Sequence, residues 1–142
     1  MGLGRTTRFA ALPEGARRVS VMRSGAGGLK DLAPSASLMR TFLDRKKLLV
    51  RQGLRSDEAH ARAARDLDYR RRFRAQVENS ARAVAALRKL VEEARDQDIY
   101  LMCMCPYRTL DRACHSYHLL DMAKELDPDL RILPEPRPAP RD

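Results

Sequence analysis

All three cysteines of this 142-residue chain, and two of its three histidines, lie in one short segment, LMCMCPYRTLDRACHSYHLL (residues 101–120). A thiolate beside an imidazole base can act as a nucleophile, and thiolates with imidazoles can also hold a soft metal ion such as zinc. A third possibility is structural, since free cysteines often serve as small apolar core residues. The residue types alone leave these three alternatives open.

The positions of these residues favour thiol chemistry at Cys114 and His115 over a metal site. Both lie near the expected start of a helix, where unpaired amides and the helix dipole favour an anion, so Cys114 is expected to be rich in thiolate. His115 or His118 would supply the base. The pattern C-x-C-x8-C-H-x2-H matches no zinc ribbon or finger, and two cysteines on one strand cannot wrap a metal as a C-x2-C knuckle does. We therefore predict no cofactor and no metal ligands, with zinc as an alternative that is not favoured.

The cysteine-bearing segment is predicted to contain a strand followed by a helix. DIYLMCMC (residues 98–105) is an apolar run that ends before Pro106, which indicates a buried strand covered on both faces. Because alternate side chains of a strand point to opposite faces, Cys103 and Cys105 would share one side at its carboxyl end. ACHSYHLLDMAKEL is expected to form the next helix. Further strands are expected at residues 5–12, 17–24 and 130–134.

Helical patterns fill most of the chain between these strands. Pro34, with Ser35 as N-cap, begins one helix that ends at Gly53, and Ser56 is expected to cap a second. Residues 66–96 contain no Gly or Pro and repeat apolar residues at three- and four-residue steps, which predicts one long helix with a core-facing stripe. This order of elements predicts an α/β fold: a small, open, mostly parallel sheet of three to four strands flanked by helices, with ligands at the carboxyl ends of the strands.

Length and composition indicate one globular domain. We expect a single α/β domain over residues 1–133, followed by a proline-rich, disordered tail over residues 134–142. No apolar run reaches the roughly 18 residues that a membrane helix needs, and the N-terminal run FAAL is shorter than a signal-peptide core. The expected protein is therefore cytoplasmic, without a membrane partner, and its cysteines stay reduced.

The positive charge is unevenly distributed. The net charge is +9, and residues 1–56 carry 12 basic against 3 acidic side chains, whereas residues 57–142 carry 16 of each. An arginine-rich excess suits phosphate groups, so a non-enzymatic nucleic-acid-binding module that uses the basic N-terminal third is the alternative function. A solvated basic surface is the simpler interpretation of the same charge.

Several of these segments together resemble the domain of unknown function 488 family, in particular its short prokaryotic branch. The similar stretches are GLKDLAPSASLMRTF, YRRRFRAQV, IYLMCMC and ACHSYHLLDMAKEL, and the resemblance runs from about residue 19 to residue 133. Its anchors are the turn at 32–35, Arg23 at the end of the early strand, Cys103, and the pair Cys114–His115. The resemblance implies a compact α/β fold without an established reaction.

Two positions depart from that family. The family usually reads Cys-His-Arg, whereas Ser116 follows His115 here, so Arg108 or Arg112 would have to supply the anion-binding arginine. An acidic residue that is common close to Arg23 is also absent. We predict a site at the carboxyl ends of the strands that binds an anionic small molecule, with Cys114 and His115 as candidate catalytic residues; whether the protein is an enzyme stays open. The candidate ligand-binding residues are Arg23, Lys30, Ser35, Cys103, Arg108 and Arg112.

Overall fold

A three-stranded parallel sheet forms the base of the molecule. Its strands are β1 (Gly2–Thr7), β2 (Arg17–Ser20) and β3 (Asp98–Cys103), in the order β1-β3-β2. The computed structural model describes residues 1–25 and 27–138. The open parallel sheet with flanking helices confirms the predicted α/β fold. All three strands run in the same direction, so their carboxyl ends meet at one edge.

The ends of the strands differ from those predicted. β1 begins at Gly2 and ends at Thr7, so the stretch assigned to residues 5–12 was placed too late in the chain. The expected strand at 130–134 is reduced to a single parallel bridge between Leu3 and Ile132. β3 matches its prediction most closely, because its apolar run is buried beneath helices and beside two strands, with Ile99 and Leu101 fully buried.

Of the N-cap residues predicted for the first two helices, Ser35 is confirmed and Ser56 is wrong. In α1 (Ala36–Arg51), the Ser35 hydroxyl accepts a hydrogen bond from the Leu38 amide at 3.1 Å, as predicted for an N-cap. In α2 (Ser56–Asp66), Ser56 is the first helical residue and Arg55 occupies the N-cap position, without a side-chain cap bond. The negative charges of Asp57 and Glu58 still lie in the first turn of α2, where the helix dipole favours them.

The predicted long helix over residues 66–96 is wrong, since the chain forms two helices there. These are α3 (Tyr69–Glu78) and α4 (Ala81–Glu93). Between them, Asn79 ends the first helix and the Ser80 hydroxyl accepts from the Ala83 amide at 3.1 Å, which caps the second. Short polar side chains of this kind compete for backbone groups, so a helix can end without Gly or Pro. Most of the predicted apolar stripe is nevertheless core, although Ala81 is exposed and Val84 is half-buried. Its buried members are Tyr69, Phe73, Val77, Leu87, Val91 and Ala94.

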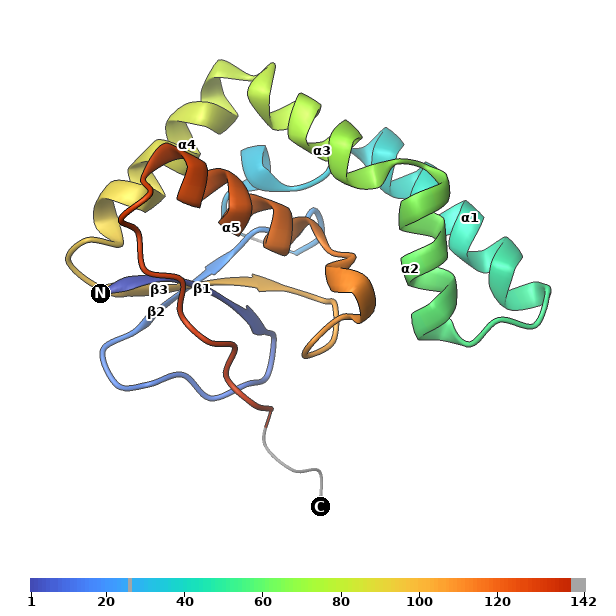
Figure 1. Cartoon of the computed structure of the whole chain (residues 1–142), viewed down its shortest axis with the longest axis horizontal. Coiled ribbons are helices and arrows are strands. Elements are labelled where there is room, and N and C mark those ends of the chain that lie inside the picture. The colour runs from blue at the N-terminus through green and yellow to red at the C-terminus, as the bar shows by residue number, and fades with distance from the viewer. Residues whose placement is uncertain (26, 139–142) are drawn as a thin grey trace.

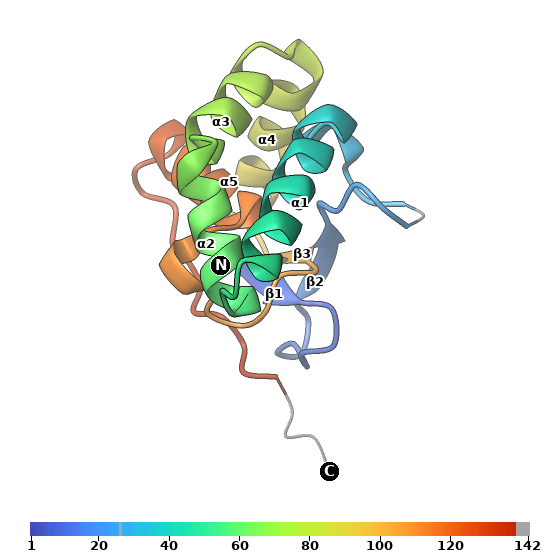
Figure 2. The ribbon, with the colours of Figure 1, turned by 90° about the vertical axis from the view of Figure 1, so that its right-hand side faces the viewer.

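The helices gather on one side of the sheet. Figure 1 shows α3, α4 and α5 (His115–Leu126) above the strands, with α1 and α2 toward the carboxyl ends of the strands. Viewed from that end, α1 and α2 lie side by side in front of the sheet (Figure 2). The carboxyl edge of the sheet is therefore enclosed by helices, and a site there can be shielded from water.

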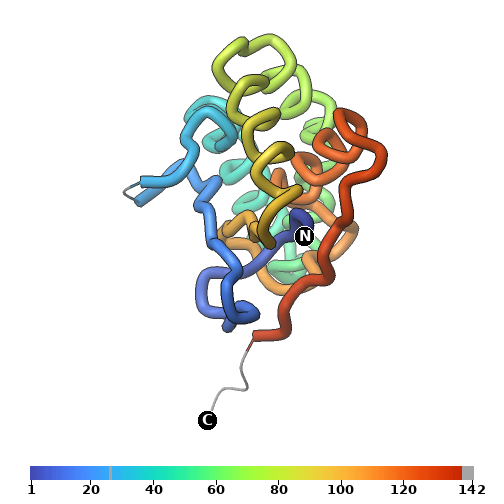
Figure 3. The backbone as a smooth tube through the Cα atoms, turned by 90° about the vertical axis from the view of Figure 1, so that its left-hand side faces the viewer, coloured from blue at the N-terminus to red at the C-terminus, as the bar shows by residue number. Residues whose placement is uncertain are grey.

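The C-terminal segment returns along the outside of β1 (Figure 3). The Leu3 amide donates to the Arg131 carbonyl at 3.0 Å, and the Leu133 amide donates to the Leu3 carbonyl at 2.9 Å. A Cβ at Gly4 would lie 2.9 Å from the Cβ of Leu133, so glycine permits this close approach. Of the tail predicted to be disordered, Glu135 makes side-chain bonds inside the fold, and residues 139–142 lie outside the described part. No helix in residues 1–25 and 27–138 has the length and apolar character needed to cross a membrane.

Candidate functional site

The three cysteine sulfurs come together at the carboxyl edge of the sheet. Cys103 ends β3, Cys105 follows two residues later, and Cys114 immediately precedes α5. The Sγ atoms of Cys103 and Cys114 are 3.3 Å apart, and all three Sγ atoms lie within 4.8 Å of one another. All three cysteines are free thiols. The predicted convergence of the strand end and the helix start on one cluster is thus confirmed.

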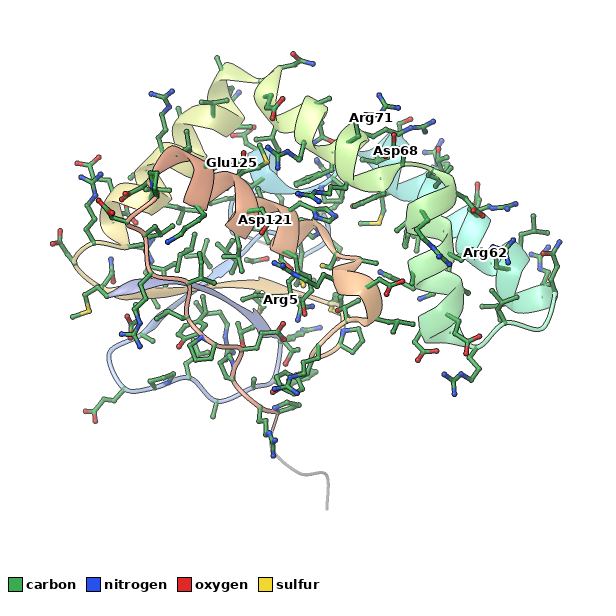
Figure 4. All side chains as sticks on the ribbon, in the orientation of Figure 1. Arg5, Arg62, Asp68, Arg71, Asp121 and Glu125 are labelled. Atoms are coloured by element: carbon green, nitrogen blue, oxygen red, sulfur yellow. The ribbon has the colours of Figure 1, made fainter. Side chains whose placement is uncertain are left out.

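A buried arginine contacts this cluster from β1. Arg5 is fully buried, and its Nη2 donates to Cys103 Sγ at 3.3 Å and to the Cys105 carbonyl oxygen at 2.9 Å. Figure 4 shows Arg5 in the interior, whereas the other labelled charged residues lie on the helices around it. Its remaining partners are Ser116 Oγ at 2.8 Å, Thr109 Oγ1 at 3.1 Å and Glu135 Oε2 at 2.9 Å. The guanidinium therefore has a partner on every nitrogen, and its positive charge is held against the sulfurs.

The charge of Arg5 and the hydrogen bonds among the sulfurs place one thiolate on Cys114. Burial opposes ionisation of Cys114, but hydrogen bonds from Cys103 and Cys105, followed by the charge of Arg5, bring the pKa of this thiol well below its usual range. The pKa of Cys105 is raised by its hydrogen bonds to the other two thiols. Cys103 also has a raised pKa: a hydrogen bond with Cys105 lowers it, but the bond with Cys114, together with burial, outweighs that contribution. Of the three thiols, Cys114 is therefore the one whose ionisation is favoured.

Two neutral histidines border the cluster. His115 Nε2 lies 2.7 Å from the Val21 carbonyl oxygen, which can only accept, so Nε2 carries the proton and Nδ1 is free to accept. That Nδ1 lies 3.8 Å from Cys114 Sγ. His60 in α2 similarly donates from Nε2 to the Ala113 carbonyl oxygen at 2.6 Å, with Cys105 Sγ 3.8 Å away. Burial is the main cause that lowers the pKa of both imidazoles, which keeps them uncharged near neutral pH.

A cavity of about 400 Å³ gives access to the three thiols. Its charged lining residues are Arg23 and Lys46, both basic, and no Asp or Glu lines it among the described residues. Most of the remaining wall is apolar or sulfur-bearing. It comprises Met22, Met39, Phe42, Leu43, Met104 and Pro106. The cavity wall is therefore mainly apolar, and its charged side chains are basic.

No known relative identifies this site. The chain matches no protein-family model, no curated protein and no solved structure. The geometry of the thiol cluster and its cavity therefore has to support any functional assignment by itself.

Among the predicted ligand-binding residues, Arg23 and Cys103 line the cavity. The Nε of Arg23 donates to the Pro34 carbonyl oxygen at 2.8 Å, which anchors that side chain at the rim. Ser24 also lines the cavity, and Ala26, two residues later, lies outside the described residues. Cys103 thus joins the cluster directly, whereas Arg23 faces the same space from the loop after β2.

The other four predicted ligand-binding residues lie away from the cavity. Lys30 Nζ donates to three carbonyl oxygens of the loop after β2, at 2.7 to 3.1 Å, and Ser35 caps α1. Arg108 is exposed, with its guanidinium carbon 5.3 Å from the centre of the Tyr107 ring. Arg112 is exposed and pairs with Asp121 at 3.3 Å. Lys30 and Ser35 therefore shape the loop and the helix, and the arginine beside the cysteines is Arg5.

His118 does not join the thiol cluster. It lines a second, smaller cavity of about 290 Å³ together with Asp68, Arg70 and Asp111. Burial, followed by the charge of Arg70, lowers the pKa of this imidazole to about 4. His115 is therefore the histidine of α5 whose free nitrogen approaches Cys114.

Arg5, His60 and Glu135 are site residues that were missed in the sequence. A signal for Arg5 exists, because it lies two positions after the buried Leu3 and side chains two apart on a strand share a face. That signal is visible only when the strand is known to begin at Gly2. His60 and Glu135 carry no comparable local pattern.

Some basic side chains of the first 56 residues form contacts within the protein. Arg5 is buried, Arg17 pairs with Glu93 at 2.5 Å, and Arg45 pairs with Asp66 at 2.7 Å. The three cysteines, in contrast, are arranged so that they can hold a metal ion.

Proposed function

We propose that the protein binds a small anionic disulfide in the thiol-lined cavity and exchanges it with the Cys103–Cys114 dithiol. The observation that carries this proposal is the 3.3 Å approach of two free sulfurs, one of which contacts Arg5, at the end of a cavity whose charged lining residues are basic. We also propose that the chain is a member of the domain of unknown function 488 family. Its compartment would be the reducing cytoplasm, where free thiols persist.

The first step is attack by Cys114. Its thiolate attacks one sulfur of the ligand disulfide, a Cys114–ligand disulfide forms, the ligand S–S bond breaks, and one half of the ligand leaves as a thiolate. Arg5 stabilises the attacking thiolate by its charge. The developing negative charge on the leaving sulfur faces a cavity that contains Arg23 and Lys46.

The second step is resolution by Cys103. Its thiol gives up a proton, and its sulfur attacks Sγ of Cys114, so that a Cys103–Cys114 disulfide forms and the second half of the ligand leaves as a thiolate. An S–S bond of about 2.05 Å requires the two sulfurs to approach by only about 1 Å. The dithiol loses two electrons and the ligand disulfide gains them, so the exchange is balanced.

His115 is the candidate base for the proton that Cys103 releases. Its Nδ1 is free because Nε2–H is held by the Val21 carbonyl. Nδ1 lies 3.8 Å from Cys114 Sγ, which is 3.3 Å from Cys103 Sγ, so a proton acceptor borders the sulfur pair at which Cys103 is deprotonated. In this role His115 handles protons, and the thiolate itself is stabilised by Arg5.

The test compares two disulfides of similar size and opposite charge, dithiodiglycolate and cystamine. Each is mixed with the reduced protein without oxygen, the reaction is quenched with acid at set times, and the formation of the protein disulfide is followed by mass spectrometry. We expect a Cys103–Cys114 disulfide and a rate constant about tenfold higher or more for the anionic reagent. Replacing both Arg23 and Lys46 by Gln should remove the preference.

Arg40 provides the matched control for the charge effect, because it is exposed on α1 and does not line the cavity. An Arg40→Gln variant should retain the preference for dithiodiglycolate. Equal rates for the two disulfides in the unmodified protein would overturn the proposed anionic ligand. A product in which Cys105, rather than Cys103, pairs with Cys114 would overturn the proposed resolving thiol.

A further inference from the structure

The cavity is unusually rich in sulfur. Besides the three cysteines, it is lined by Met22, Met39 and Met104, which are half of the six methionines in the chain. Met22 also packs directly against the cysteine cluster. Thiolates and thioethers are the soft ligands that select soft metal ions such as Cu(I). The cavity wall thus presents thioethers along the approach to three thiols.

Carboxylates are absent from the described lining of the same cavity, where the residues with hydroxyl groups are Ser24 and Tyr69. Nε2 of both neighbouring histidines donates to a backbone carbonyl, at 2.6 Å for His60 and 2.7 Å for His115. Zinc in a structural site is almost always bound by four ligands. The described residues bring three donor atoms within 4.8 Å of one another, and all three are cysteine sulfurs. A three-coordinate, sulfur-only site suits Cu(I) better than zinc.

We infer that Cys103, Cys105 and Cys114 bind one Cu(I) ion as a three-coordinate thiolate site, reached through the methionine-lined mouth of the cavity. Binding forms three Cu–S bonds, releases the protons of the thiols that are still protonated, and leaves the oxidation state of every atom unchanged. Arg5 stabilises the site from behind, since its positive charge offsets part of the negative charge of the three thiolates and its Nη2 donates to Cys103 Sγ.

This inference uses the same sulfurs as the proposed disulfide exchange but does not depend on it. Exchange needs Cys103 and Cys114, whereas the copper site needs Cys105 as well. Cys105 is half-buried at the cavity wall, so serine can replace it with little change in volume. The Cys105→Ser variant therefore separates the two functions.

The experiment is an anaerobic titration of the reduced full chain with Cu(I) in competition with the chromogenic chelator bathocuproine disulfonate. We expect one Cu(I) per chain. Cys105→Ser should bind at least about 100-fold more weakly, since losing even an outer partner of a metal site costs about 10- to 100-fold. The same variant should still form the Cys103–Cys114 disulfide with dithiodiglycolate. Met102→Leu, at a methionine that does not line the cavity, is the matched control and should keep the unmodified affinity.

Three results would overturn the inference: equal Cu(I) affinity in Cys105→Ser, no binding in competition with the chelator, or displacement of Cu(I) by equimolar zinc. X-ray absorption at the copper edge of the unmodified protein tests the site even where a variant fails to fold. A first shell of three sulfurs supports the inference, and a nitrogen neighbour contradicts it. If copper binds but dithiodiglycolate leaves Cys103 and Cys114 reduced, the proposed function falls while the copper site stands.

Discussion

The guanidinium of Arg5 lies against the sulfur of Cys103, with Nη2 and Sγ 3.3 Å apart, although the residues are separated by 98 positions in the chain. The contact follows from the sheet order, because β1 is the direct neighbour of β3 and Thr7 is in register with Cys103. A fully buried cation is costly unless it is paired and hydrogen-bonded, so the surrounding acceptors and thiols are part of what keeps Arg5 in the fold.

Replacing Arg5 by Met is expected to lower the free energy of unfolding by about 3–5 kcal/mol, because it leaves the partners of a buried ion pair without their cation. Urea denaturation followed by circular dichroism measures the change. Arg17→Met is the control, since the Arg17–Glu93 pair is partly exposed and should contribute no more than about 1 kcal/mol. Similar losses in the two variants would contradict a special role for Arg5.

Glu135 is expected to stabilise the fold although it lies in the proline-rich C-terminal segment. Its carboxylate accepts from Arg5 Nη1 at 2.9 Å, from the Arg108 amide at 3.1 Å and from the Tyr117 hydroxyl. Glu135→Ala should therefore cost about 1–3 kcal/mol of stability, as expected when buried donors lose an acceptor. Glu125→Ala, which removes an exposed partner of Arg74, should cost less than about 1 kcal/mol in the same assay.

Cys114 is expected to be alkylated by iodoacetamide before the other two thiols at neutral pH. Hydrogen bonds from the neighbouring thiols and the charge of Arg5 lower the pKa of Cys114, while the pKa values of Cys103 and Cys105 are raised. Peptide mass spectrometry at short reaction times identifies the labelled residue. In urea, where these contacts are lost, all three should react alike. Equal labelling of the three thiols in the native protein would show that the thiolate is not held on Cys114.

Stability is expected to fall below about pH 6.5 because of His118. Burial lowers the pKa of this imidazole to about 4, so the unfolded chain takes up a proton that the folded chain excludes. The free energy of unfolding is highest above the pKa of this imidazole in the unfolded chain. It decreases as the pH falls toward the pKa in the folded chain, by about 2 kcal/mol between pH 7 and pH 5.

The charges of Arg70, Asp121 and Arg112 act on His118, with His115 nearby, and Asp68 and Asp111 line the same cavity. Urea denaturation at pH 7 and pH 5 of the unmodified protein and of His118→Gln measures the effect. The free energy of unfolding of the variant should decrease less between pH 7 and pH 5. Part of the decrease should remain, because the pKa values of His60 and His115 are also lowered. An identical pH dependence of stability in the two proteins would show that His118 does not cause it.

Ser80 is expected to define the boundary between α3 and α4. Its hydroxyl caps α4, so Ser80→Ala should lower the free energy of unfolding by about 1 kcal/mol. Ser37→Ala is the control: Ser37 is exposed within α1, where alanine is the better helix former, and the change should be neutral or slightly stabilising. Thermal unfolding of both variants decides whether the hydroxyl of Ser80 matters.

Several features of this protein follow from its sequence because they depend on neighbours in the chain. The apolar run DIYLMCMC predicts β3, Ser35 predicts the start of α1, and the alternation of strand and helix predicts the parallel α/β sheet. The meeting of Cys103 with Cys114 also follows, since a strand end and the start of the next helix lie at the same edge of such a sheet.

Tertiary structure decided the surroundings of the thiols. Arg5, His60 and Glu135 reach the site from three segments distant in the chain, and no local periodicity records which strand lies beside β3 or which helix covers its end. Lys30 and Arg112, chosen for their charge, instead bond to a loop and to the surface residue Asp121. The sequence determines the chemical type of each side chain. The partners of that side chain depend on strand order and helix packing, which result from burial of the whole core.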